Sequence, residues 1–223
     1  MKKKSAFTMI ELVFVIVVLG IIASIAMDKV DRDLEQEASS TILSHIRLAQ
    51  QLALNDNKHR SDNDPLWQRA YWRFEYGKCS GLDEYYYRVG SDIDMDGTID
   101  KSESAINPSD GKYLYTFNTC NALQEDESPT VLLGKKFGIK KIRKYGGCSS
   151  VQHIAFDYLG RPEHQLASYT QADFSKYMSS DCRLKFEMST DINHDGIIDG
   201  DDSFTIMILA ETGHAFVVGE EDF

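Results

Sequence analysis

The sequence predicts an α+β protein in which one long N-terminal helix packs on an antiparallel β-sheet. Three observations support this fold class. An uncharged apolar run extends from Leu12 to Met27, apolar residues then recur every three to four positions, and short alternating segments fill the chain after Pro65. The 223 residues are enough for this helix and one further domain.

The first part of the helix is predicted to span a membrane. Residues 1–6 form a leader that contains Lys2, Lys3 and Lys4, and residues 7–27 follow as an apolar segment. As a helix this segment is about 30 Å long, which matches the hydrocarbon thickness of a bilayer. A short basic leader before such a helix is typical of a membrane-targeting signal. We therefore expect a single-pass membrane protein.

Residues 28–60 are predicted to continue the same helix with one apolar face. The apolar positions follow the helical period and are Val30, Leu34, Ala38, Ile42, Ile46, Ala49 and Ala53. The polar stretch from Asn55 to Asn57, followed by Pro65, should end the helix. This apolar stripe is expected to pack on the sheet.

Residues 61–223 are predicted to form a β-rich head. Runs rich in aromatic and β-branched residues, separated by Gly, Asn and Asp, indicate strands at Tyr71–Tyr76, Tyr85–Val89, Tyr113–Phe117, Val151–Asp157, Leu184–Met188, Phe204–Leu209 and Ala215–Val218. No second helical pattern of comparable strength occurs in this part of the sequence. The head is therefore expected to be an antiparallel sheet with irregular connections.

Glu11 is the unusual residue of the N-terminal segment, because a carboxylate within an apolar span is unfavourable unless it has a function and a partner. The stretch Ala6-Phe7-Thr8-Met9-Ile10-Glu11-Leu12-Val13 resembles the class III signal of type IV pilins and type II secretion pseudopilins. The resemblance implies that a prepilin peptidase cleaves between Ala6 and Phe7 and methylates the new N-terminus. The family more often has Gly where this chain has Ala6.

In a filament of bundled helices, Glu11 of one subunit would neutralise the Phe7 ammonium of a neighbour and so set the subunit register. Leaving one member of such a buried pair alone is unfavourable by about 3 to 5 kcal/mol. The alternative is an ordinary signal anchor whose acid reaches the membrane interface.

Within this family the chain resembles the H-type minor pseudopilins and the related FimT-type minor pilins. The resemblance is carried by Ile46–Ala53, Ile154–Pro162, Phe204–Ile208 and Thr212-Gly213. It implies a minor pseudopilin that is anchored in the bacterial inner membrane, with its head in the periplasm, and that assembles with other pilin-like subunits into a filament for protein export. Secreted cargo would be a further partner. The alternatives are a DNA-uptake or adhesion pilin, and a membrane-anchored calcium-dependent adhesin without a filament.

Two twelve-residue segments have the pattern of a calcium-binding loop, with oxygen-bearing side chains at alternating positions and Gly at the sixth. The first provides Asp92, Asp94, Asp96, Thr98, Asp100 and Glu103 as candidate ligands. The second provides Asp191, Asn193, Asp195, Ile197, Asp199 and Asp202. Thr98 and Ile197 would each contribute a backbone carbonyl.

The flanking segments read as strands, so one or two calcium ions would stiffen connections between strands rather than open a pair of helices. The alternative is two acidic turns held by side-chain to backbone hydrogen bonds.

The four cysteines, Cys79, Cys120, Cys148 and Cys182, all follow the predicted span. An even number in an exported domain favours two disulfides, and three connectivities are open. We prefer the sequential pairing, Cys79 with Cys120 and Cys148 with Cys182.

The formal net charge of −11 disfavours general affinity for nucleic acid. One basic cluster stands out, made of Lys135, Lys136, Lys140, Lys141, Arg143 and Lys144. We interpret it as a solvated hairpin that faces an acidic neighbour, and a local phosphate-binding patch is the alternative. The sequence contains no nucleophile, nucleotide-binding or zinc-protease motif, so no enzymatic activity is expected.

Overall fold

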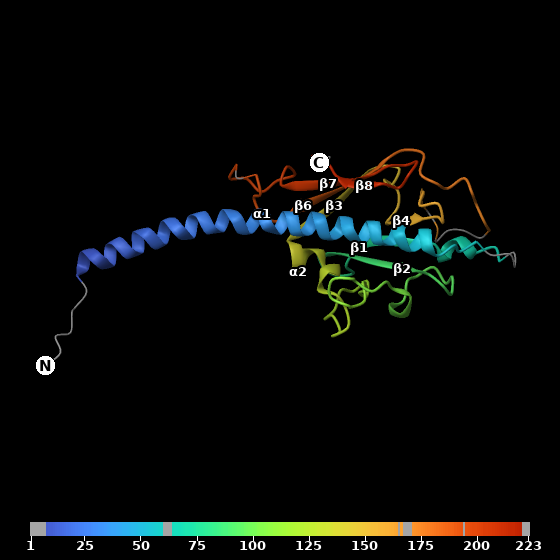
Figure 1. Cartoon of the computed structure of the whole chain (residues 1–223), viewed down its shortest axis with the longest axis horizontal. Coiled ribbons are helices and arrows are strands. Elements are labelled where there is room, and N and C mark those ends of the chain that lie inside the picture. The colour runs from blue at the N-terminus through green and yellow to red at the C-terminus, as the bar shows by residue number, and fades with distance from the viewer. Residues whose placement is uncertain (1–7, 60–63, 165, 167–170, 194, 220–223) are drawn as a thin grey trace.

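The computed structural model describes residues 8–59, 64–164, 166, 171–193 and 195–219, and for residues 23–33 it describes the backbone only. One long helix, α1, runs the length of the head, and two antiparallel four-stranded sheets pack beside it (Figure 1). The predicted α+β class with an N-terminal helix and antiparallel strands is therefore confirmed. The single sheet expected from the sequence is instead two sheets.

Helix α1 extends over Met9–Asn55, and Asp56 is its C-cap. Within the head it buries the predicted stripe, since Ala38, Ile42, Ile46, Ala49 and Ala53 are at most 2% exposed. The predicted span, 7–27, includes Phe7 and the side chains of residues 23–27, which lie outside the described residues. Over the part of the chain that the structure describes, no helix meets the length and hydropathy needed to cross a membrane.

The first sheet has the strand order β2-β1-β4-β5 and the second the order β3-β6-β7-β8. The strands of the first are β1 (Trp72–Lys78), β2 (Tyr85–Ser91), β4 (His153–Phe156) and β5 (Pro162–Glu163). Those of the second are β3 (Ile139–Gly146), β6 (Cys182–Met188), β7 (Ser203–Ile208) and β8 (Ala215–Val217). Short helices at Trp67–Ala70, Lys101–Glu103, Pro129–Val131 and Leu133–Phe137, the last being α2, connect them.

Polar side chains of α1 attach the helix to loops of both sheets. Gln50 Nε2 donates hydrogen bonds of 2.9 Å to the carbonyls of Gly160 and Thr212. Arg47 donates two to the carbonyl of Ala215, at 2.7 and 3.1 Å. Buried backbone carbonyls need donors. These contacts therefore fix the rotation of the helix relative to the late strands.

Two sequence predictions in the middle of the chain are wrong. Residues 113–117 form no regular strand, and Tyr113 makes only isolated bridges with Ile106 and Glu127. The basic cluster is not a hairpin, because it is divided between α2 and the edge strand β3. Lysine-rich sequence is common on edge strands, where charge blocks unwanted pairing. That charge obscured the strand pattern of Ile139 and Ile142.

The two acidic loops lie toward opposite ends of the head. The first follows β2, whose last residue, Ser91, pairs with Trp72. The Trp72 indole donates a 2.9 Å hydrogen bond to Asp56 at the C-terminal end of α1. The second connects β6 to β7, and Ser189 before it donates a 2.7 Å backbone hydrogen bond to Gly138, which follows α2. Thus the second loop lies toward the N-terminal side of the head (Figure 1).

Candidate functional site

The start of α1 is organised by Thr8 and Glu11. The backbone N–H and the hydroxyl of Thr8 donate to Glu11 Oε2 at 2.9 and 2.7 Å, and the Glu11 N–H donates to Thr8 Oγ1 at 3.4 Å. This reciprocal pair is a capping box, which satisfies backbone donors at the helix start. Ala6 and Phe7, on either side of the predicted cleavage, lie outside the described residues.

The first turns of α1 present apolar side chains to their surroundings on all sides. Met9 is 86% exposed, and the other exposed large apolar side chains in this region are Ile10, Leu12, Val13, Phe14, Val15, Ile16, Val17, Leu19, Ile21 and Ile22. Such a surface requires lipid or other protein chains to cover it. It is therefore suited to a bundle of helices or to a membrane.

The first acidic loop, Asp92–Glu103, is closed by hydrogen bonds from its own backbone. The N–H of Gly97 donates to Asp92 Oδ2 at 3.0 Å, and the N–H of Thr98 donates to Asp96 Oδ1 at 2.8 Å. Gly97 has a φ of 102°, in the left-handed region where glycine has no side chain to strain. The carboxylates of Asp92, Asp94 and Asp96 converge, with one oxygen of each within 4.8 Å of the others.

Glu103, the twelfth residue of the first loop, closes it from the other side. One carboxylate oxygen accepts from the N–H groups of Ile93 and Asp94 at 2.7 and 3.1 Å, and the other accepts from the N–H of Asp100 at 2.9 Å. Glu103 and Asp100 are not part of the group of converging carboxylates. Thus three of the predicted ligands are brought together by their side chains, and the twelfth acts as a brace.

The second acidic loop, Asp191–Asp202, repeats these hydrogen bonds. The N–H of Gly196 donates to Asp191 Oδ2 at 2.8 Å, and the carboxylate of Asp202 accepts from the N–H groups of Ile192, Asn193 and Asp199. The corresponding N–H groups of positions five and seven donate to Asn193 and Asp195 at 3.1 and 2.8 Å. The two loops therefore have one backbone geometry, although they are far apart in the chain.

Each loop contains a buried carboxylate oxygen that lacks a hydrogen-bond donor within the described part of the chain and could bind a cation. The second oxygen, Oδ1, of Asp92 and that of Asp191 are buried and have no hydrogen-bond donor among the described residues. The pKa of Asp92 is raised to about 6, mainly by burial and to a smaller extent by the neighbouring Glu103 and Asp96, while the Arg73 guanidinium and the Gly97 N–H oppose the rise. A hard divalent cation would supply what these oxygens lack. The residues present therefore fit calcium.

Arg73 is a buried cation beside the first loop that sequence reasoning missed. It lies in β1, is 1% exposed, and places Nη1 3.7 Å from Asp92 Oδ2. Its Nε also lies 3.3 Å from Glu75 Oε2, and Nη1 donates to the carbonyl of Arg69. The sequence offered one weak signal that Arg73 is buried, namely its position inside the predicted strand Tyr71–Tyr76, next to Phe74. Its proximity to Asp92 follows only from the pairing of β1 with β2.

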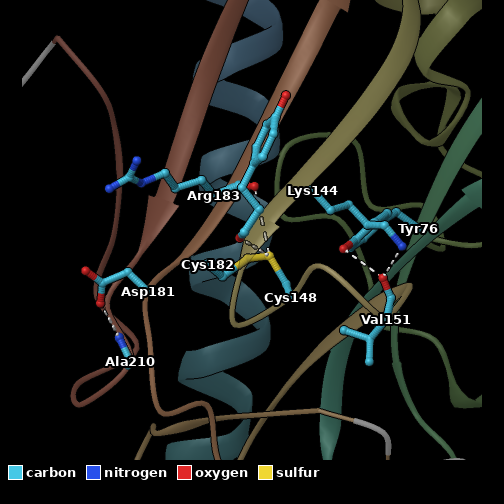
Figure 2. Close-up of a disulfide and its surroundings, with 9 residues drawn as sticks. Tyr76, Lys144, Cys148, Val151, Asp181, Cys182, Arg183 and Ala210 are labelled. Atoms are coloured by element: carbon cyan, nitrogen blue, oxygen red, sulfur yellow. Dashed lines mark hydrogen bonds between the residues drawn. A yellow bond between two sulfur atoms is a disulfide. The ribbon is translucent and has the colours of Figure 1, made fainter.

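The structure contains two disulfides, Cys79–Cys120 and Cys148–Cys182, which is the sequential pairing preferred above. The second ties the turn after β3 to the start of β6 (Figure 2). Next to it, Lys144 Nζ and the hydroxyl of Tyr76 both donate to the carbonyl of Val151, at 2.7 and 3.3 Å. Lys144 is therefore engaged by the backbone.

Several side chains of the predicted basic cluster have acidic or carbonyl partners, and strand pairing places two more cations beside the cluster. Lys136 pairs with Glu37 of α1 at 2.6 Å, Arg143 pairs with Glu187, and Lys140 donates to the carbonyl of Asp199. Register adds two further cations, since Tyr145 lies opposite Arg183 and Arg143 lies opposite Lys185. A shallow cavity of about 450 Å³ elsewhere involves neither group.

Arg183 and Lys185 were missed by sequence reasoning because they lie about forty residues beyond the cluster in the chain. Together with Tyr145, Thr205, Met207 and Val218 they line a shallow cavity of about 390 Å³ on the second sheet. Leu184 and Phe186, which alternate with them, are buried, so both cations point away from the core. Two cations on one face of the sheet are suited to an anionic partner.

Comparison with known proteins supplies one match. The family model described as the prokaryotic N-terminal methylation motif matches residues 1–27. No curated protein and no solved structure matches the chain. The matched segment includes the predicted cleavage site, Glu11 and the apolar run. Together with the exposed apolar start of α1, this match supports the assignment of the chain to the type IV pilin and pseudopilin family.

Proposed function

We propose that this protein is a minor pseudopilin, a structural subunit of a periplasmic type II secretion filament rather than an enzyme. The methylation motif at residues 1–27 is the observation that carries the proposal. It implies processing by a prepilin peptidase, a membrane-anchored precursor with a periplasmic head, and assembly with other pilin-like subunits. The apolar surface of the first turns of α1 would be covered by the helices of neighbouring subunits.

The contacts around Gln50 support the H-type subgroup. Three of the four segments that resemble H-type pseudopilins, 46–53, 154–162 and 212–213, meet at this side chain, which donates to the carbonyls of Gly160 and Thr212. A Cβ at Gly213 would collide with the carbonyl of Gly160. The resemblance therefore falls on residues that contact one another, as expected when a shared fold constrains them.

Calcium would stabilise the two acidic loops of this head. Asp92, Asp94 and Asp96, whose carboxylates converge, would hold one ion. Asp191, Asn193 and Asp195 would hold a second, at the buried Oδ1 of Asp191 that has no donor among the described residues, with further oxygens from the rest of each loop. The ion supplies positive charge, so that the crowded carboxylates attract a common centre instead of repelling one another. Its role would be structural, because each loop follows a strand and is braced by its own twelfth residue.

Two measurements test the assembly role. The N-terminus of the protein from membranes should be a methylated Phe7 by mass spectrometry, and an intact leader would contradict the proposal. Glu11→Ala and Glu11→Gln should both be processed yet fail to enter filaments, because neither can neutralise a buried ammonium.

Thr8→Val is the matched control for Glu11. It removes the hydroxyl of the capping box but retains the Glu11 carboxylate. We expect it to assemble. If Thr8→Val failed to assemble as completely as Glu11→Ala, Glu11 would act through helix capping and not through its charge.

A DNA-binding pilin is the second candidate, and the position of Arg183 and Lys185 favours it. These cations lie beside Tyr145, which is exposed, and neither makes an ion pair with a described residue. Cations with an exposed aromatic ring suit a single nucleic-acid strand. Arg183→Glu with Lys185→Glu should then abolish a gel shift at low salt, and Lys135→Glu on α2 should not. Absence of any shift for the unmodified protein would remove this candidate.

A further inference from the structure

The second acidic loop exposes two adjacent isoleucines. Ile197 is 61% exposed and Ile198 is 55% exposed, although the loop around them is closed by hydrogen bonds. The residue equivalent to Ile198 in the first loop is Ile99, which is fully buried. Two adjacent branched apolar side chains on a projecting loop form a larger apolar tip than a single exposed isoleucine such as Ile93, and such a tip is suited to contact with a partner. The eighth residue is therefore exposed in the second loop and buried in the first.

The pair lies at the end of the head that faces the predicted membrane span. Lys140 Nζ donates to the carbonyl of Asp199 in this loop, and Lys136 on α2 pairs with Glu37 of α1. At 1.5 Å per residue, α1 covers only about 15 Å between Met27, where the predicted span ends, and Glu37. Figure 1 shows the connection between β6 and β7 projecting past the sheet toward the N-terminal half of α1.

We propose that Ile197 and Ile198 dock into the lipid headgroup region of the membrane that anchors α1, before the subunit enters a filament. This inference rests on the membrane anchoring and the calcium loops of the proposed function. A lipid surface is the occupant that the position of the loop supports, because the helix leads from the head into the apolar segment on the same side. Apolar tips beside polar groups are suited to the bilayer interface.

A cation is expected to control this contact. Asp195 precedes the isoleucines in the sequence, and Asp199 and Asp201 follow them, so that their carboxylates would be repelled by anionic lipid phosphates. A calcium ion in the loop offsets that repulsion and holds the tip in one shape. The docked subunit would then rest with its head on the membrane, and entry into the filament would release it.

The test uses the full chain in vesicles of equal parts phosphatidylethanolamine and phosphatidylglycerol, with brominated acyl chains that quench nearby tryptophan. Ile198→Trp introduces the probe, and the signal of the unmodified protein, which arises from Trp67 and Trp72, is subtracted. We expect at least a twofold loss of the added signal in calcium and its recovery in chelator. Ile93→Trp is the matched control, because Ile93 is 56% exposed in the first loop at the other end of the head. It should not be quenched.

Four results would overturn the inference or its cation dependence. No quenching of Ile198→Trp in calcium, or equal quenching of both variants, would overturn lipid docking. A blue-shifted emission without quenching would place the pair against another protein chain. Equal quenching in calcium and chelator would overturn the cation requirement.

Folding and processing are checked on the same samples. The melting temperature of Ile198→Trp should match that of the unmodified protein, and Ile197→Trp provides a second probe of the same tip. Normal cleavage before Phe7 together with absent quenching would overturn this inference alone. An uncut leader would overturn the proposed function.

Discussion

The two acidic loops have the same internal hydrogen bonds but different surroundings. In the first loop, Asp92 is buried beside Arg73, and the eighth residue, Ile99, is packed so closely that a Cβ at Gly90 would collide with it. In the second loop, the eighth residue, Ile198, is exposed, and no described arginine or lysine forms an ion pair with Asp191. The sequence of each loop therefore determines its local turn. The packing of the loop against the rest of the chain determines how much the loop contributes to the stability of the head.

The pKa values of two buried carboxylates, Asp202 in the second loop and Asp92 in the first, are shifted in opposite directions. Burial alone would raise the pKa of Asp202, but the N–H groups of Asp199, Asn193 and Ile192 outweigh it and lower the pKa. Asp92 in the first loop has a raised pKa instead. The negative charge of Asp92 in the first loop is therefore poorly compensated. In the second loop, the N–H groups around Asp202 stabilise its ionised form. Calcium should matter more for the stability of the first.

The largest expected effect comes from Arg73→Met in the absence of calcium. It leaves Asp92 buried without its neighbouring cation, so we expect the free energy of unfolding to fall by about 3 to 5 kcal/mol. Calcium should restore part of the loss, because it replaces the missing positive charge. Denaturant unfolding with calcium and with chelator measures both values. Arg183→Met, on the exposed face, is the control, and an equal loss in both conditions for Arg73→Met would indicate that Arg73 acts through packing.

Truncation of the eighth residue compares the two loops directly. Ile99→Ala should lower the free energy of unfolding by about 2 to 5 kcal/mol, since it leaves a cavity in a fully buried position. Ile198→Ala should change it by no more than about 0.5 kcal/mol, because the side chain is exposed. Thermal or denaturant unfolding of the two variants measures the difference. Similar losses would show that the second loop is also packed on the head.

Glu163 provides a buried carboxylate outside both loops. Burial raises its pKa from 4.5 to about 7, Asp157 adds to this, and Arg161 opposes it. The protonated form is favoured in the folded state, so this group stabilises the head below about pH 4.5 and the contribution is lost as the pH rises through about 7. The loss corresponds to about 3 kcal/mol.

Melting temperatures between pH 5 and pH 8 measure that loss, with and without calcium. Glu163→Gln should remove this part of the pH dependence, because an amide does not titrate. Calcium should leave the difference between the two proteins unchanged. If calcium abolished it, the comparison between loop carboxylates and other buried carboxylates would fail.

The effect of calcium on the unmodified protein is expected to be smaller than that of Arg73→Met. At a calcium concentration of 100 times the dissociation constant, binding to the folded state alone adds about 2.7 kcal/mol. For a chain of this size that is a rise in melting temperature of about 5 to 10 °C. Asp92→Asn and Asp191→Asn should each retain one ion fewer by metal analysis, and Asp92→Asn should lose more of the rise. Equal melting temperatures in calcium and in chelator would contradict the prediction that the two loops bind calcium.

Elements with a strong local pattern were predicted close to where they lie. The apolar stripe of Ala38, Ile42 and Ile46 faces the core, and α1 ends at Asn55, within the polar stretch expected to end it. The strands around Tyr85 and Phe204 are also present. Each depends on the spacing of residues that are neighbours in the chain. The short strand β5 and the charged strand β3 lacked such spacing and were missed.

The residues of the candidate site likewise divide into those that the local sequence predicted and those that it did not. The carboxylates of each loop were identified because a twelve-residue turn is specified by its own side chains and by one glycine. Arg73, Arg183 and the burial of Ile99 were not, because each depends on which strands pair. Strand register brings residues together from distant parts of the chain, and no local pattern records the choice of partner.

The sequence by itself determined the signal before Phe7, the position of Glu11, the length of the helix and the internal turns of the two loops. All of these follow from the order and chemistry of adjacent residues. Only the tertiary structure decided that there are two sheets, that one loop is built into the core while the other projects toward the N-terminal side, and that cations from β3 and β6 share one face. Those features depend on burial and on long-range pairing, whose free energy arises only when the whole chain is packed.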